Sequence, residues 1–339
     1  MQKKSRITIY DVAERAGVSI STVSRVMNSS NLVTEPTRVR VLKAIEALRF
    51  RPDRTAKSLA RKAARSFAVA IPTFTMPFHN ELLKGVRFRL RQLDIDLLLC
   101  DLGTKSPNAT LMNFLDRGSV QGLLLVGVAL DEHIVEELET LHSPVVLVGT
   151  QHPAFDSFSW DDRAGAAAAI EHLIGLGHTR IAMIVSHTSG SMQQERLEGA
   201  QEAMGKAGGS FSREDIFCGS TEKHAGFSEE AGYEAMQRIL SERPDVTAVF
   251  ALSDVQAIGA WKAIRDAGRE IPGDIALVGY DDIKTSQYMG LSSVDQRMHE
   301  VGEQATELIL QRMTGEEKAS PVHRLIVPAL VARRSSRPG

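Results

Sequence analysis

The sequence predicts an α/β protein in which a three-helix head precedes two Rossmann-like lobes, each built on a parallel sheet. The first observation is a set of short helical patterns separated by glycine-containing or polar turns within residues 1–50. The second is a change at residue 66, after which short apolar runs alternate with helical stretches, as in parallel sheets covered on both faces. The third is a repeat of this alternation from about residue 163. A chain of 339 residues is long enough for about two domains.

The first two helices are expected to form a helix-turn-helix. Thr8 can cap the first helix, because the Asp11 carboxylate follows three residues later. Gly17 ends this helix, since the turn needs a residue that tolerates positive φ. Ser19 then caps a second helix that ends near Asn28. Two short helices joined by a turn of this kind form a helix-turn-helix.

A third helix is predicted to begin near Thr34, where a carboxylate and a proline occupy the first turn. Its apolar face is expected to consist of Val39, Leu42, Ala44, Ile45 and Leu48. This helix completes the head.

The charge of the chain is divided unevenly between its two parts. The net charge of the whole chain is −2, but residues 1–65 contain 15 Lys+Arg and 5 Asp+Glu, a net charge of +10. The remaining residues therefore carry −12. A basic head on an acidic body indicates an electrostatic partner, such as DNA, for the head only.

The second helix presents short polar groups and a guanidinium away from its packed face, which suits insertion into the major groove. Ile20 or Thr22 can contact a thymine methyl group, and Arg25 can bind either guanine or a phosphate. The other outward residues are Ser21, Ser24 and Asn28. The alternative is a three-helix protein-binding module, which the charge of the head disfavours.

The segment after the head has two interpretations. Pro52 breaks the preceding helix, and the basic stretch that follows is too short to form a stable helix alone. It is either a plain linker or a segment that folds on DNA, with Leu59 as an apolar wedge in the minor groove.

The residues from Thr8 to Asn28 resemble the N-terminal signature of the LacI/GalR family of bacterial transcription regulators. The matching runs are Tyr10-Asp11-Val12-Ala13, Ala16-Gly17-Val18-Ser19, Thr22-Val23-Ser24-Arg25-Val26 and Asn28. Arg51-Pro52 through Leu59 is similar to the hinge helix of that family, with Lys57 where many members have Arg. The resemblance implies a regulator, expected to be a repressor, that binds a palindromic double-stranded DNA operator as a homodimer.

The resemblance and the helix pattern together give a set of candidate DNA contacts. They are Thr8, Tyr10, Ser19, Ile20, Ser21, Thr22, Ser24, Arg25, Asn28, Thr34, Lys57 and Leu59. The predicted organisation is a DNA-binding domain at 1–50, a hinge at 51–65 and an effector-binding and dimerisation domain at 66–339. Families of this type form tetramers through a terminal heptad helix, and the absence of heptads before Gly339 favours a dimer.

The body is expected to contain one small-molecule site. The predicted strands are 67–71, 95–100, 122–126, 145–148, 181–185, 248–252 and 275–280. The predicted helices are 79–93, 107–117, 131–141, 164–176, 193–207, 226–241 and 254–267. Ligands of such sheets bind beyond the carboxyl ends of the strands, so two lobes place one ligand between them.

The body also resembles the effector domain of the same family, which is of the periplasmic-binding-protein type. By that analogy the chain crosses between lobes near residues 162, 291 and 322. The N-lobe would then comprise 66–162 and 292–322, and the C-lobe 163–291 and 323–336. The resemblance extends to the terminal run Pro328–Ser336.

The candidate effector contacts lie at the predicted strand ends. They are Phe78, Trp160, Asp161, Arg196, Ser253, Asp254, Asp281 and Gln296. Ionised hydrogen-bonding groups beside flat apolar rings suit a sugar or related polyol. Three positions depart from the family pattern, with Asp162 and Ser253 in place of Asn and Gln194 in place of Arg.

Each effector candidate also has a structural alternative. Phe78 and Phe158 can belong to the core, Arg196 can pair with Glu195 or Glu198 on a solvated face, and Asp281 can cap a turn.

Several other classes are disfavoured by composition. Two cysteines, Cys100 and Cys218, cannot form a disulfide framework or a zinc site, and no metal or cofactor is expected. No secretory signal or membrane-length apolar run is present, so we expect a cytoplasmic protein. The rival function is an enzyme with Asp161, Asp162 and Asp281 as acid/base groups, but no phosphate-binding glycine loop follows any strand.

Overall fold

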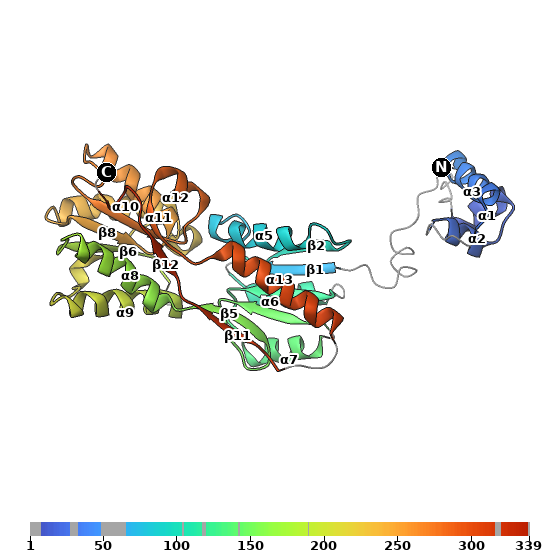
Figure 1. Ribbon diagram of the computed structural model, residues 1–339, viewed down its shortest axis with the longest axis horizontal. Helices are drawn as coiled ribbons and strands as arrows, with labels where there is room; N and C mark the ends of the chain where they lie inside the picture. The colour runs from blue at the N-terminus through green and yellow to red at the C-terminus, as the bar shows by residue number, and fades with distance from the viewer. Residues whose placement is uncertain are drawn as a thin grey trace. The chain divides into compact units, whose positions relative to one another are not determined.

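The computed structural model describes residues 8–27, 33–48, 66–103, 105–116, 120–141, 143–188, 190–315 and 320–337. The chain divides into two compact units, Met1–Ala64 and Arg65–Gly339, which are considered separately (Figure 1). The predictions for Asn28, Lys57 and Leu59, and for the side chain of Ser24, lie outside the described residues. None of the helices in the described ranges is long and apolar enough to cross a membrane.

The first unit contains α1 (Ile9–Ala16), α2 (Ile20–Met27) and α3 (Glu35–Leu48). The predicted capping of α1 is confirmed, because the backbone N and Oγ1 of Thr8 donate to Asp11 Oδ2 at 2.6 and 2.7 Å. Gly17 ends α1 with φ 63° and ψ 40°. Ser19 caps α2, since its Oγ accepts from the backbone N of Thr22 at 3.2 Å.

The core of the head is formed by one stripe from each helix. Val12, Val23 and Val41 have no exposed surface, and Ala44 is 4% exposed. The predicted apolar face of α3 is partly wrong, because Val39 and Leu42 are exposed. The stripe 41, 44, 45 and 48 follows the i, i+3, i+4, i+7 spacing of one helix face, and positions 39 and 42 lie outside it.

The second unit has two lobes, each with a six-stranded sheet. The N-lobe strands are β1 (Ser66–Ile71), β2 (Asp96–Asp101), β3 (Gly122–Val126), β4 (Val145–Val148), β5 (Asp156–Trp160) and β11 (His323–Ile326). They are all parallel in the order β11-β5-β4-β3-β1-β2. One face packs against α5 (Pro77–Leu90) and α13 (Met298–Thr314), and the other against α6 (Pro107–Leu115) and α7 (Glu132–Thr140).

The C-lobe repeats this plan. Its strands are β6 (Ile181–Val185), β7 (Ile216–Cys218), β8 (Ala248–Ala251), β9 (Ala276–Tyr280), β10 (Ser292–Asp295) and β12 (Ala329–Val331). In the order β12-β10-β9-β8-β6-β7, the β10–β12 pair is antiparallel and the other pairs are parallel. One face is covered by α8 (Asp162–Gly175) and α9 (Ser191–Lys206), and the other by α10 (Glu229–Glu242) and α11 (Asp254–Asp266). The short elements η1 (Arg213–Asp215), η2 (Lys223–Gly226) and α12 (Lys284–Met289) complete the lobe.

Two of the three predicted lobe crossings are displaced. The chain crosses between β5 and α8 as expected, but β10 pairs with β9 of the C-lobe and β11 pairs with β5 of the N-lobe. The second crossing therefore follows residue 295 rather than 291, and the third follows residue 326 rather than 322. β11 and β12 follow one another in the chain, and each forms an edge strand of one of the two sheets (Figure 1). These strands are short, and their assignment depends on pairing with distant strands, which local pattern does not reveal.

Glycines bring the paired helices into backbone contact. A Cβ placed on Gly199 of α9 would lie 2.0 Å from the Arg163 carbonyl oxygen of α8, and one on Gly85 of α5 would lie 2.0 Å from the His299 oxygen of α13. A Cβ placed on Gly259 of α11 would likewise lie 1.9 Å from the Glu229 carbonyl oxygen of α10. Each helix pair therefore depends on at least one residue without a side chain.

Candidate functional site

The outward face of α2 is the candidate DNA-reading surface. Ser19, Ile20, Ser21 and Arg25 are exposed, whereas Val23 on the opposite face is fully buried. Thr22 is half-buried, and its hydroxyl lies 2.9 Å from that of Ser19. These side chains are therefore held by a packed helix but are not needed for its core.

The other candidates in the head lie at helix starts. Tyr10 in the first turn of α1 is 67% exposed, and Thr8 and Thr34 precede α1 and α3 with exposed side chains. The Thr34 hydroxyl donates to the hydroxyl of Thr37 at 3.1 Å. Backbone and hydroxyl groups at exposed helix starts are suited to phosphate contacts.

Four of the predicted effector residues meet where the lobes join. Trp160, at the end of β5, donates from Nε1 to the backbone oxygen of Gln296 at 2.7 Å. Gln296 follows β10 and donates from Nε2 to Asp281 Oδ1 at 2.8 Å. Asp161 caps α8, with Oδ1 accepting from the backbone N of Ala164 at 2.8 Å. A chain of hydrogen bonds thus links the strand ends of the two lobes.

Arg196 of α9 is held by groups of the C-lobe. The residue is 3% exposed, and Nε donates to Asp162 Oδ1 at 2.7 Å while Nη1 donates to the Leu252 oxygen at 2.6 Å. The guanidinium carbon lies 3.6 Å from the ring centroid of Tyr280, whose hydroxyl donates to the same Asp162 oxygen at 2.9 Å. The predicted alternative, pairing with Glu195 or Glu198, is not the arrangement that these contacts show.

Asp281 stands at the end of β9 in an unusual backbone conformation. Its φ of 111° is rare for a residue with a side chain, and its backbone N donates to the Val294 oxygen at 2.8 Å. Burial raises the pKa of Asp281 well above its usual range; Arg196 opposes this rise, and the charge of Asp254 adds to it. A strained, partly buried carboxyl group beside a guanidinium is a feature of binding sites.

The placement of Asp254 contradicts its predicted role as an effector contact. Asp254 has no exposed surface, and its carboxylate accepts from the backbone N of Ile283 at 2.9 Å and from Ser293 Oγ at 2.6 Å. Burial raises the pKa of Asp254 to about 7. Ser253 is also buried and caps α11. Both residues hold the loop after β9 and the start of α11 in place.

The aromatic candidates divide into core and site. Phe158 has no exposed surface and belongs to the N-lobe core, which is the structural alternative given for it. Phe78, in the first turn of α5, is half-buried, with its ring centroid 6.4 Å from that of Trp160. These two rings supply the flat apolar surface beside Asp161.

The loop after β7 has an unusual backbone conformation that the sequence did not reveal. His224 and Ala225 have φ of 50° and 56°, and the Ala225 oxygen accepts from the backbone N of His187 at 2.8 Å. Burial lowers the pKa of His79 in α5; Asp101 opposes this, and the charge of His224 lowers it further. His79 and His224 belong to different lobes and are distant in the sequence, so their proximity could not be predicted from the sequence.

Asp162 and Tyr280 were also missed as site residues. Asp162 was noticed as a departure from the family pattern and as an acid/base group of the rival enzyme hypothesis, and Tyr280 as a strand residue. The adjacency of Asp162 to Asp161 was the one available signal, whereas the stacking of Tyr280 under Arg196 arises from tertiary packing. No group of three or more His, Cys, Asp or Glu side chains within the described ranges can hold a metal ion.

Glu234 of α10 anchors the start of the loop after β7. Its carboxylate accepts from the backbone N and Oγ of Ser220, both at 2.7 Å, and from the N and Oγ1 of Thr221 at 2.9 and 2.7 Å. The hydroxyl bond from Thr221, followed by that from Ser220, lowers the pKa of Glu234 to about 2. The folded protein therefore favours the ionised form.

Because the folded-state pKa is depressed, Glu234 stabilises the fold above pH 4.5, and this contribution is lost as the pH falls towards 2. We expect Glu234→Gln to lower the free energy of unfolding by about 1 kcal/mol at pH 7, a value reduced for solvent screening. Urea unfolding at pH 7 and pH 3 measures this. A difference between variant and wild type that is as large at pH 3 as at pH 7 would contradict the role of the ionised carboxylate.

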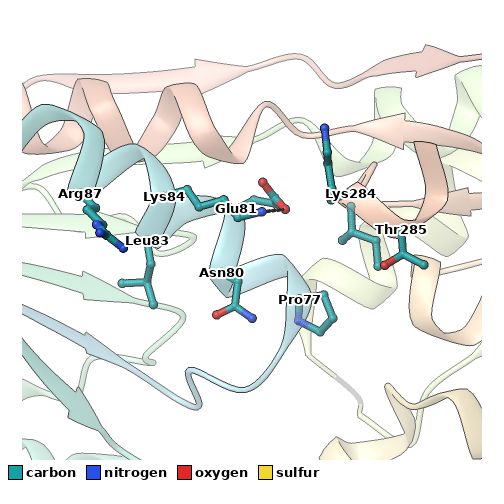
Figure 2. A pocket seen from close by; sticks show the side chains of 9 residues that line it. Pro77, Asn80, Glu81, Leu83, Lys84, Arg87, Lys284 and Thr285 are labelled. Carbon is teal, nitrogen blue, oxygen red and sulfur yellow. Dashed lines mark hydrogen bonds and ion pairs between the residues drawn. The ribbon is translucent and has the colours of Figure 1, made fainter. Parts of the chain in front are cut away.

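A hollow of about 440 Å³ lies between α5 of the N-lobe and the start of α12 of the C-lobe. Figure 2 shows that α5 supplies most of its lining and that Lys284 and Thr285 come from the start of α12. Its remaining lining residues are Pro77, Asn80, Glu81, Leu83, Lys84, Arg87 and Ile283. None of these is a predicted effector residue.

Comparison with known proteins agrees with this arrangement. Residues 8–53 match the family model "Bacterial regulatory proteins, lacI family", and residues 170–336 match "Periplasmic binding protein-like domain". The regulator DegA of Bacillus subtilis (strain 168) is 30% identical over 98% of this chain and 99% of its own. CelR of Thermobifida fusca is 30% identical over 99% of this chain and 100% of its own.

Two solved structures share the fold over nearly the whole chain. A CelR–cellobiose complex is 30% identical, with a TM-score of 0.68, covering 98% of this chain and 100% of its own. A lac repressor dimer bound to operator and the anti-inducer ONPF is 27% identical, with a TM-score of 0.78, covering 98% of this chain and 99% of its own.

These relatives are transcriptional regulators and not enzymes, so the enzyme alternative is not supported. The helix-turn-helix head, the two-lobed body and the similarity over almost the whole length lead to one conclusion: the chain belongs to the lacI family of bacterial regulatory proteins.

Proposed function

We propose that this regulator binds a palindromic operator as a homodimer in the bacterial cytoplasm, and that a neutral sugar or related polyol at the lobe junction controls its affinity. The observation that carries the DNA-binding part is the exposed face of α2, with Ser19, Ile20, Ser21 and Arg25, at the start of a segment, residues 1–65, of net charge +10. This face suits the major groove.

Exposed apolar side chains on the body support the homodimer. Leu98 and Leu99 of β2 are 40% and 47% exposed, and Tyr288 of α12 is 80% exposed. Strands of a parallel sheet are ordinarily buried on both faces, so β2 has the character of a strand covered by a partner. The lac repressor structure contains a dimer at its operator.

The effector part rests on the chemistry of the lobe junction. Asp161, Asp281 and Arg196 provide hydrogen-bonding groups, while Phe78 and Trp160 provide flat apolar surfaces. A polyol ring has both hydroxyl groups and apolar faces, so this combination suits it. The similar CelR is known in complex with cellobiose.

Control of DNA affinity requires that the effector favour one arrangement of the lobes. Residues of both lobes meet at the junction, so a ligand held there contacts each lobe differently when their angle changes. A coupling of about 1–3 kcal/mol between effector and operator alters operator affinity by roughly 5- to 150-fold.

Selection of binding sites from a random DNA library tests the operator proposal. The full-length protein is expected to enrich an inverted repeat, and its affinity should fall steeply with salt, because phosphate contacts release counterions. Enrichment of a single asymmetric half-site, or of no sequence, would refute it.

Leu59 is proposed as a wedge between base steps in the minor groove. Leu59→Ala should weaken binding to the selected operator by at least tenfold and change binding to random DNA by less than threefold. The reason is that a side chain inserted between base steps kinks the DNA, and only the specific complex includes this kink. Titrations of both DNAs at one salt concentration measure this. Equal losses on the two DNAs would show that Leu59 has no wedge role.

A thermal-shift screen of neutral sugars on the full-length protein tests the effector proposal. A ligand at one hundred times its Kd stabilises the native state by about 2.7 kcal/mol, and the same ligand should change operator affinity. If no sugar or polyol raises the melting temperature, the effector class is wrong.

A further inference from the structure

The charge of Arg196 is matched by the protein before any effector arrives. Its Nε donates to Asp162 Oδ1 at 2.7 Å, and the side chains of both residues are buried, at 4% and 9% exposure. A second donor, Nη1, is used by the Leu252 oxygen. Although burial would lower the pKa of Arg196, attraction by Asp162 raises it above its usual value. Arg196 is therefore a neutralised donor and not a free cation.

The carboxyl groups around this pair exceed the positive charge available to them. Partial burial raises the pKa of Glu195, and the charges of Asp162 and Asp161 raise it further. The pKa of Asp281 is also raised, chiefly because of burial, with opposing attraction by Arg196 and added contributions from Asp254 and Asp162. The contributions of Asp161 and Asp162 to these shifts mean that further negative charge is unfavourable here, and an incoming anion would meet the same repulsion.

The nearby cations from other elements do not offset this imbalance. Arg163 of α8 lowers the pKa of Glu195, but its own guanidinium is paired with Glu198 and Glu202 on the outer side of α9. Burial lowers the pKa of His79, so its ring is neutral at pH 7. The balance at the junction therefore depends on Asp162 and Arg196.

We propose that Asp162 sets the charge class of the effector: by neutralising Arg196 it excludes phosphorylated and carboxylated sugars and admits neutral or amine-bearing ones. This inference rests on the proposed effector site and adds the charge preference and the residue that imposes it. Asp162 touches Arg196 rather than the effector, so it acts as a positioning and charge-balancing residue.

Asp162→Asn changes this charge with little change in geometry. The bond from Arg196 Nε and the bond from the Tyr280 hydroxyl both end on Asp162 Oδ1. The amide oxygen of asparagine can accept both bonds. Arg196 would remain in place but would no longer face a carboxylate at contact distance.

The matched control is Glu202→Gln on α9. Glu202 is 50% exposed, and its carboxylate lies 3.0 Å from Arg163. Like Asp162→Asn, this variant removes one negative charge that is paired with an arginine, but the pair that it breaks lies at the surface. Any effect of total charge on anion binding will appear in both variants.

The experiment compares full-length wild type, D162N and E202Q at constant ionic strength. The probes are glucose with glucose 6-phosphate, ribose with ribose 5-phosphate, and inorganic phosphate, measured by calorimetric titration and thermal shift. Wild type and E202Q should bind each phosphorylated sugar at least tenfold more weakly than its neutral parent. D162N should reduce the ratio of the two dissociation constants, phosphorylated sugar over neutral parent, at least tenfold. Of the three proteins, only D162N should show a higher melting temperature in inorganic phosphate.

The outcomes separate this inference from the proposed function. Wild type that binds either sugar phosphate as tightly as its parent would overturn the inference, as would D162N that gains neither sugar-phosphate nor inorganic-phosphate binding. If no sugar binds but D162N gains inorganic phosphate, the charge rule is supported and the sugar proposal fails. If D162N does not fold, the wild-type ratios of the two sugar pairs decide.

Discussion

Arg196→Met should lower the free energy of unfolding of the body by about 3–5 kcal/mol, the usual cost of leaving a buried charge without its partner. Asp162 is 6% exposed, and in this variant it would retain the Tyr280 hydroxyl but no cation. Effector binding should be lost as well, because Arg196 is a proposed effector contact. Denaturant unfolding followed by tryptophan fluorescence measures the body alone, since Trp160 and Trp261 both lie within it.

The double variant Arg196→Met/Asp162→Asn provides the control. With the carboxylate replaced by an amide, no uncompensated charge remains, and the double variant should be more stable than Arg196→Met by about 2 kcal/mol. A double variant that is less stable than the single one would show that lost packing, and not the orphaned carboxylate, causes the destabilisation.

Gly259→Ala should be the most damaging methyl addition in the C-lobe. The new Cβ would lie 1.9 Å from the Glu229 oxygen and 2.7 Å from the Tyr233 backbone N of α10, so α10 and α11 would have to separate. These helices cover one face of the sheet, and overpacking of this kind costs about 3 kcal/mol. For a unit of this size the melting temperature should fall by about 10 °C.

Gly205→Ala in α9 is the matched control. No heavy atom lies within 4 Å of its added Cβ, and alanine is preferred to glycine in a helix by about 0.5–1 kcal/mol. This variant should melt at or above the wild-type temperature in the same calorimetric scan. Equal losses for the two substitutions would show that close helix contact is not what selects glycine at position 259.

The effector site was only partly predictable because its partners are distant in sequence. Asp281 was found as a polar residue at a predicted strand end, and Asp161 and Arg196 through the family resemblance; their hydrogen-bond partners are Gln296, Ala164 and Asp162, respectively. Asp254 satisfied the same criterion, but its carboxylate turns inward to Ile283 and Ser293. Position at a strand end indicates the region, whereas the direction of a side chain depends on the neighbouring loops.

The short strands show the same limit in the fold. β7 and β12 are only three residues long, and β5 and β11 contain polar residues, so none has the continuous apolar run that identified β1 and β3. They form because a neighbouring strand already offers unpaired backbone groups. For the same reason the second and third lobe crossings were placed too early.

The sequence by itself determined the order of the main elements and the division into a basic head and an acidic body. Periodicity, capping residues such as Thr8 and Ser19, and local charge are properties of neighbouring residues, so they can be read without the fold. Only the tertiary structure decided that Asp162, Arg196 and Tyr280 form one neutralised cluster. Hydrogen bonding, stacking and charge balance act over a few ångströms, and the lobe junction brings these residues within that distance.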